Sequence, residues 1–272
     1  MRESGDPTAP LDAALLLAHV LGVGKEALYA HGGEPVPDEL EGAFGELVER
    51  RAAGEPVAYL RGWKEFYGLR FAVDPRVLIP RPETEVLVDA VRDLVRRRGA
   101  SLIADVGTGS GAIAVAVAVH EPGARLIASD LSADALAVAR ENALAHGVAA
   151  RIDLRQGDLL SPIGERVDVV AANLPYLRDG EVDRFVGART SLAFEPRSGV
   201  VAGPDGLELM RRCAADLSRV LAPGGSVLFE CDPPQASAIA ELLSAAIRGS
   251  TRVLRDLSGD ERVVAVERER GR

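Results

Sequence analysis

Short apolar segments alternate with helical patterns from residue 85 to the end of the chain, and no other feature of the sequence constrains the fold as strongly. The apolar segments predict strands at 101–106, 125–129, 152–155, 167–172, 226–231, 251–256 and 263–267. The helical patterns predict helices at 85–98, 112–120, 133–146, 206–221 and 234–247. Strands that alternate with helices pair in parallel, with helices on both faces. We therefore expect an α/β fold with a Rossmann-like sheet of seven strands, the last antiparallel because only a short turn precedes it.

Residues 112–120, AIAVAVAVH, can be interpreted in two ways, because their β-branched residues alternate with alanine in the period of a strand. We predict a helix, since alanine is the best helix former and a crossover helix must follow the preceding strand. The next helix has clearer ends. Ser132 is the predicted N-cap, and Gly147 is the predicted glycine just past the C-terminus.

The chain before residue 81 has a different character and is predicted to form two smaller parts. Residues 1–60 are predicted to form a small helical domain, which buries little area alone and is expected to pack on the rest of the chain. In residues 61–80, aromatic and β-branched residues alternate with polar ones around Gly68, which predicts a β-hairpin linker. Residues 81–272 would then form the main domain.

Composition and charge narrow the class of partner. The formal net charge is -9, which disfavours non-specific binding to nucleic acid, because phosphate contacts are made by Lys and Arg. Cys213 and Cys231 show no metal-ligand or disulfide spacing, so we expect no metal site and a reducing compartment. No signal segment and no apolar stretch of membrane-spanning length is visible, so we expect a cytoplasmic protein without a membrane partner.

A glycine-rich loop, DVGTGSG at residues 105–111, follows the first strand of the main domain. Open α/β sheets bind ligands at such a strand end, and the three glycines let the backbone approach a ligand closely. The pattern GxGxxA, ending at Ala112, is typical of a dinucleotide site. The pattern GxGxG preceded by Asp105 is typical of an S-adenosylmethionine site, in which Asp105 helps to position the methionine end. The loop alone leaves both interpretations open.

Two acidic residues follow the next two strands. Asp130 can accept hydrogen bonds from both ribose hydroxyls, a role that both cofactors would use. Asp158 can accept from an adenine amino group, with Leu159 packed on the ring. Together these residues predict a nucleoside-containing cofactor at the strand ends.

The sequence Asn173-Leu174-Pro175-Tyr176 follows the apolar strand 167–172 and separates the alternatives best. An acceptor –NH2 group can donate one hydrogen to the Asn173 side-chain oxygen and the other to the Leu174 carbonyl. Pro175 restricts the backbone that presents this carbonyl, and Tyr176 offers a flat wall for a planar group. Holding the nitrogen in line with a methyl donor lowers the barrier chiefly by positioning. The motif predicts methyl transfer to a planar nitrogen, either an amide or an adenine.

Four stretches together carry a resemblance to a known family: GWKEFYGLRFAVDPRVLIPRPETEVLV, DVGTGSGAIA, NLPY and FEPRSGVVAGPDGL. They resemble the HemK/PrmC family of protein N5-glutamine methyltransferases over nearly the whole chain, most specifically through PRPETE at Pro80 to Glu85. The resemblance implies S-adenosyl-L-methionine as cofactor and the GGQ glutamine of peptide chain release factors as acceptor, with the N-terminal helices contacting the substrate protein. The implied cofactor site consists of Gly107, Thr108, Gly109, Ser110, Gly111, Asp130, Asp158 and Asn173. The implied glutamine-holding residues are Asn173, Leu174, Pro175 and Tyr176, and of these Asn173, Pro175 and Tyr176 are the implied catalytic residues.

Two departures from the family pattern are visible. Leu174 replaces the first proline of NPPY, and NLPY also occurs in rRNA adenine-N6 dimethyltransferases. The segment Glu230-Cys231-Asp232 stands where the family tends to have an acid followed later by glycine, which bears on the sheet edge. Three alternative functions stay open from the residues: adenine-N6 methylation of nucleic acid, a dinucleotide-dependent oxidoreductase and a non-catalytic binding module.

We expect a monomer that acts on release factors.

Overall fold

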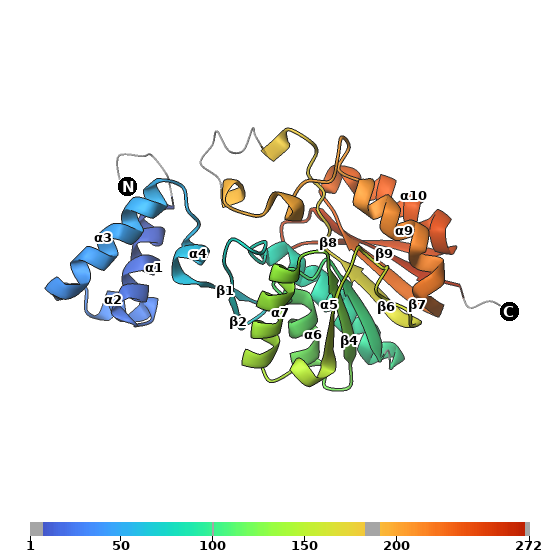
Figure 1. Cartoon of the computed structure of the whole chain (residues 1–272), viewed down its shortest axis with the longest axis horizontal. Helices are drawn as coiled ribbons and strands as arrows, with labels where there is room; N and C mark the ends of the chain where they lie inside the picture. The colour runs from blue at the N-terminus through green and yellow to red at the C-terminus, as the bar shows by residue number, and fades with distance from the viewer. Residues whose placement is uncertain (1–7, 100, 183–190, 270–272) are drawn as a thin grey trace.

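A computed structural model describes residues 8–99, 101–182 and 191–269 and contains the predicted seven-stranded sheet (Figure 1). The strands are β3 (Leu102–Val106), β4 (Arg125–Asp130), β5 (Ile152–Gln156), β6 (Val167–Ala172), β7 (Leu221–Glu230), β8 (Gly249–Arg255) and β9 (Glu261–Arg268). Their order across the sheet is β5-β4-β3-β6-β7-β9-β8. All neighbours pair in parallel except that β9 is antiparallel to both β7 and β8. The predicted Rossmann-like fold with a reversed last strand is confirmed.

Among the described residues, five helices cover the two faces of this sheet: α5 (Glu85–Arg98), α6 (Ala112–His120), α7 (Ala133–Ala145), α9 (Glu208–Val220) and α10 (Ala236–Ile247). Side chains of α5 and α6 share one buried cluster with one face of the strands, and side chains of α9 and α10 share a second cluster with the other face. Within the described ranges, no helix has both the length and the apolar character needed to cross a membrane.

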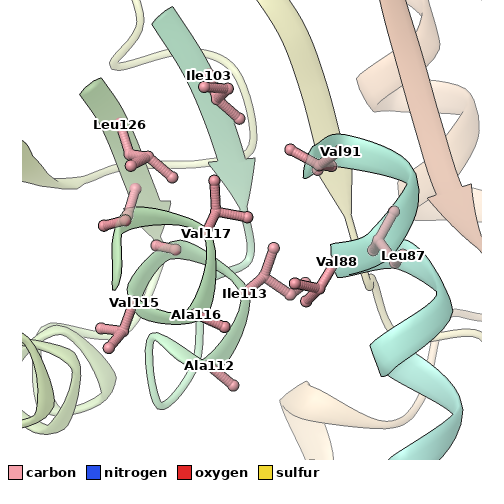
Figure 2. Packing of buried hydrophobic residues seen from close by; sticks show 14 of the residues in the cluster. Leu87, Val88, Val91, Ile103, Ala112, Ile113, Val115, Ala116, Val117 and Leu126 are labelled. Carbon is pink, nitrogen blue, oxygen red and sulfur yellow. The ribbon is translucent and has the colours of Figure 1, made fainter. Parts of the chain in front are cut away.

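The ambiguous segment 112–120 is the helix α6, as predicted. It is apolar on every side because it is covered on every side, and each of its first seven residues is buried. Figure 2 shows Ile113 of α6 pointing toward Val88 of α5, with Ile103 of β3 nearby. Burial between α5 and the sheet therefore accounts for a helix in a segment whose sequence period alone favours a strand.

The predicted ends of helix α7 are confirmed. The hydroxyl of Ser132 accepts a hydrogen bond from the Ala135 backbone N–H at 3.2 Å, and Gly147 has a φ of 69°. The predicted start of β7 was wrong, because this strand begins at Leu221 rather than at residue 226. Helix α9 passes directly into this strand, and the ladder with β6 shifts register between Val167 and Val169.

The N-terminal part consists of α1 (Ala9–Leu21), α2 (Lys25–Ala30), α3 (Asp38–Ala52) and α4 (Val57–Arg61). Figure 1 shows these helices set apart from the sheet. An ion pair of 2.8 Å between Arg51 and Asp12 joins α3 to α1. A hairpin of β1 (Trp63–Phe66) and β2 (Leu69–Ala72) follows, with Tyr67 and Gly68 both at positive φ in its turn. The hairpin is thus shorter than the predicted range 61–80, since residues 73–80 form no strand. The division of the chain into three parts stays a prediction.

Candidate functional site

The loop after β3 is tied to the end of β4 by backbone hydrogen bonds. The N–H groups of Gly107 and Thr108 both donate to the Ser129 carbonyl, at 2.8 and 3.0 Å, and the Gly109 N–H donates to an Asp130 carboxylate oxygen at 2.9 Å. The three loop glycines have φ values of 73°, 55° and 78°, a region that other residues rarely adopt. The carboxyl edge of the sheet therefore carries a preformed glycine loop.

Two of these glycines also permit close packing. A Cβ on Gly107 would lie 3.1 Å from the Leu174 side chain, and a Cβ on Gly111 would lie 3.1 Å from Cβ of Ala139. Nothing would lie within 4 Å of a Cβ on Gly109. The first and last glycines therefore serve contacts within the fold, whereas the middle one faces open space.

Asp105 supports the loop from inside the protein. It is fully buried, and its Oδ2 accepts from the Thr108 hydroxyl at 2.6 Å and from the Ala114 N–H at 3.1 Å. Burial raises the pKa of Asp105 to about 6, although both hydrogen bonds act in the opposite direction. Its Oδ1 has no hydrogen-bond partner among the residues that the structure describes. An unpaired buried oxygen beneath the loop suits a site that is completed by a ligand or water.

A cavity of about 400 Å³ opens beside the loop. The predicted cofactor residues that line it are Gly107, Gly109, Asp130, Asp158, Leu159 and Asn173. Thr108, Ser110 and Gly111 do not line it. They shape the loop from behind: the Thr108 hydroxyl bonds to Asp105, and the Ser110 carbonyl accepts from Asn142 at 2.8 Å.

The two predicted acids have partners within the protein. Each carboxylate oxygen of Asp130 accepts a backbone N–H, Oδ2 from Gly109 and Oδ1 from Ser132, both at 2.9 Å. The carboxylate keeps lone pairs for a further donor, so it can hold the loop and a ribose together. Asp158 is about half exposed and pairs with Arg212. Both acids line the cavity beside the glycine loop.

Several residues of this cavity were not found from the sequence. They are Arg76, Val77, Leu78, Leu131, Ser132, Ala135, Pro196, Ser198, Gly199 and Leu209. Leu131 directly follows Asp130 in the sequence and is 67% exposed in the structure. Pro196, Ser198 and Gly199 belong to FEPRSG, a motif to which no role was assigned. Nothing local indicates that these distant segments meet.

A second cavity, of about 340 Å³, adjoins the first. It is lined by all four residues of the NLPY motif together with Leu78, Arg81, Leu177, Leu192, Gly199 and Val200. Asn173, Leu174 and Pro175 border both cavities, whereas Tyr176 borders only the second. Two chambers that meet at Asn173 suit a reaction between two bound molecules.

The Asn173 amide has a defined orientation. Its Nδ2 donates to the hydroxyl of Thr84 at 3.1 Å, and Oδ1 receives no hydrogen bond from the described residues. The Leu174 side chain is 3% exposed and packs toward Gly107, so this residue presents its backbone rather than its side chain. Burial raises the pKa of Tyr176 to about 12, so its hydroxyl stays protonated. The motif therefore offers oxygen acceptors and an apolar wall.

The PRPETE stretch forms part of the second cavity. Arg81 bonds to Glu195, a buried acid that also accepts the Ile79 N–H at 3.1 Å. Thr84 bonds Asn173, while Glu85 accepts the Tyr67 N–H at 2.8 Å and so contacts the hairpin instead. Among the residues of this stretch, Arg81 and Thr84 are therefore the ones at the site.

Comparison with known proteins agrees with this arrangement. Residues 1–62 match the PrmC N-terminal domain family, and residues 82–191 match the methyltransferase small domain family. The release factor glutamine methyltransferase of Bordetella pertussis is 42% identical over 261 residues, 95% of each chain. That of Deinococcus radiodurans is 37% identical over 272 residues, 100% of this chain and 95% of the relative.

Solved structures share the fold at lower identity. The ribosomal protein L11 methylase of Lactobacillus delbrueckii subsp. bulgaricus has a TM-score of 0.51 at 24% identity, over 72% of this chain and 84% of the other. A methyltransferase of Pyrococcus furiosus has a TM-score of 0.53 at 15% identity, over 74% and 90%. The near full-length relatives decide between the two interpretations of the glycine loop in favour of a methyltransferase. The chain therefore belongs to the family of release factor glutamine methyltransferases.

Proposed function

We propose that this protein transfers a methyl group from S-adenosyl-L-methionine to the side-chain nitrogen of a glutamine, N5, in the GGQ motif of a peptide chain release factor. The observation that carries the proposal is the meeting of two cavities at Asn173 to Pro175. One cavity suits a nucleoside cofactor, and the other presents oxygen acceptors for an –NH2 group. The relatives named above are release factor glutamine methyltransferases, which supports the choice of acceptor.

The first cavity fits the cofactor by the chemistry of its residues. Gly109 leaves room at the loop, Asp130 offers oxygen acceptors for hydroxyl groups, and Asp158 with Leu159 suits an adenine edge and face. The bound cofactor would supply a methyl group on a positively charged sulfur. The protein contributes position and exclusion of water.

The second cavity would hold the glutamine amide. Its –NH2 group donates to Oδ1 of Asn173 and to the Leu174 carbonyl, which aligns the nitrogen with the methyl group. Tyr176 and the apolar side chains Leu177 and Val200 surround the amide, so that the nitrogen reacts out of water. The new N–C bond would form as the S–C bond of the cofactor breaks and S-adenosylhomocysteine leaves, and the proton lost by the nitrogen would pass to water.

Transfer from methyl-labelled cofactor to a purified release factor tests the proposal. Label should appear on the GGQ peptide and should vanish when that glutamine is replaced by alanine. Asn173→Ala should abolish transfer while it retains most of the cofactor affinity. Transfer that persists after the glutamine is replaced, or that goes instead to RNA or DNA offered as acceptor, would refute the glutamine assignment.

We further propose that the protein acts as a monomer in the cytoplasm. Both cysteines are free and buried, which suits a reducing compartment but does not require one. Size-exclusion chromatography with light scattering would test the monomer, with a mass near the chain's 28.7 kDa expected.

A further inference from the structure

Glu230 is a buried carboxyl group beside the catalytic asparagine. It is the last residue of β7 and is 1% exposed. Strands β6 and β7 pair in parallel with Ala172 opposite Phe229, so the residues that come next, Asn173 and Glu230, lie side by side at the carboxyl edge of the sheet. The role of the Glu230 side chain can be inferred from its surroundings.

Within the described ranges, this buried acid forms no ion pair. Its Oε2 is buried and has no hydrogen-bond partner among the residues that the structure describes. Arg262 of β9 faces it but pairs with Asp256 at 3.1 Å. The negative charge of Glu83, an exposed residue on the segment before α5, opposes ionisation of Glu230. A carboxylate kept in such a place is costly, which points to a task at the site.

Thr84 connects Glu230 to Asn173. Thr84 ends the short 3-10 helix η2 (Pro82–Thr84), is 4% exposed and accepts the Asn173 Nδ2–H at 3.1 Å. A hydroxyl that accepts one hydrogen bond keeps its own proton to donate. Burial raises the pKa of Glu230 to about 7, and hydrogen bonding from the Thr84 and Asn173 side chains acts in the opposite direction. Both neighbours thus favour the ionised acid.

The two faces of an asparagine amide are not equivalent, because one end only donates and the other only accepts. A hydroxyl oxygen and a carboxylate on one side admit only the –NH2 end there, which leaves Oδ1 for the second cavity. We propose that Thr84 and Glu230 are positioning residues that hold the Asn173 amide with Oδ1 toward the acceptor nitrogen; this inference rests on the proposed function. A flipped Asn173 would set its –NH2 against the –NH2 of glutamine, donor against donor.

Three variants separate this role from simple packing. Glu230→Gln keeps the size of the side chain but places a donor beside the Asn173 –NH2 group. Thr84→Val keeps the shape of threonine without its hydroxyl, and Thr84→Ser keeps the hydroxyl. Glu241→Gln, on the exposed face of α10, is the matched control for the loss of one charge.

The expected effect falls on kcat, because the substrate glutamine still binds but a misoriented Asn173 holds its amide nitrogen out of line with the methyl group. Glu230→Gln and Thr84→Val should lower kcat about 10- to 100-fold, as small misplacements of reacting groups do. The Kd for S-adenosylmethionine, measured by calorimetry, should stay within about twofold, since no cofactor contact is removed. Thr84→Ser should rescue most of the activity, and Glu241→Gln should match the wild type. Wild-type kcat in both Glu230→Gln and Thr84→Val would overturn the inference.

A second readout does not depend on the acceptor. The side-chain N–H2 signals of Asn173 can be assigned by NMR from their loss in Asn173→Asp. They should exchange slowly with water in the wild type and faster in Glu230→Gln and Thr84→Val. Unchanged exchange in both variants would overturn the positioning role even if the wild type methylated no release factor. A wild type that methylates no release factor would instead refute the proposed function.

Discussion

Replacement of Glu230 by glutamine should improve stability relative to the wild type more at alkaline pH than at acidic pH, while it impairs catalysis. Burial raises the pKa of this carboxyl from its ordinary 4.5 to about 7. The folded state therefore keeps a proton that the unfolded state loses between about pH 4.5 and 7. Stability then falls as the pH rises through this window and stays low above it. A glutamine at this position has no proton to lose and escapes the penalty.

The size of the effect follows from the pKa difference. Each unit of pKa difference corresponds to about 1.36 kcal/mol of unfolding free energy. The loss of unfolding free energy from ionising Glu230 is therefore absent at acidic pH and approaches roughly 3 kcal/mol above pH 7. Because part of it has already appeared at pH 5, the wild type should lose roughly 2 to 3 kcal/mol relative to the variant between pH 5 and pH 8. For a chain of 272 residues, this corresponds to a melting-temperature difference of roughly 4 to 5 °C.

Urea unfolding of both proteins at pH 5 and pH 8 measures this difference directly. Asp105, whose pKa burial raises to about 6, titrates in the same window, but it is present in both proteins and cancels in the comparison. The unfolding free energy of Glu230→Gln minus that of the wild type should increase with pH. A difference that is the same at both pH values would refute the reasoning, because it would mean that Glu230 titrates normally. Glu241→Gln should show no such pH dependence.

Three other outcomes are expected. In the wild type, kcat should fall as the pH drops through about 7, because protonated Glu230 accepts more weakly and gains an O–H donor beside the Asn173 –NH2 group. A pH–rate profile of Glu230→Gln should lack this limb. Gly111→Ala should lower the unfolding free energy by about 1 to 3 kcal/mol more than Gly109→Ala, because only its Cβ meets Ala139; equal losses in urea melts would contradict this. Arg81→Ala should raise KM for the release factor and leave cofactor binding intact; weaker cofactor binding in calorimetry would contradict the placement of Arg81 in the second cavity alone.

Much of the fold could be predicted because its signals are local. The alternation of strands and helices from residue 85, the cap at Ser132 and the glycine at 147 depend on neighbouring residues only. The errors arose where tertiary structure intervenes. Strand β7 starts five residues early because it continues directly from α9, and the hairpin ends at Ala72 because Val77 and Ile79 beyond it pack against α7 instead.

The candidate site likewise has one part that could be predicted from local sequence and one part that could not. The glycine loop and the NLPY motif are contiguous in sequence, and both were found. Thr84, Asn173 and Glu230 are far apart in the chain and meet only because β6 and β7 are neighbours and η2 packs at their ends. No periodicity reports such a meeting. Residues that hold a catalytic group, rather than contact the substrate, are therefore the part of this site that sequence reasoning missed.

Leu174, the departure from the family motif that left the acceptor open, has a different meaning in the folded protein. Its side chain is 3% exposed and lies against Gly107, so it packs under the glycine loop and only its backbone carbonyl can receive a donor. A proline or a leucine at this position presents the same carbonyl to the acceptor nitrogen. The choice between an amide and a larger adenine must then be made by the walls of the second cavity, where Arg81 and Tyr176 stand. The family assignment and the motif are thus compatible, because the residue that differs lies on the packed side of the loop.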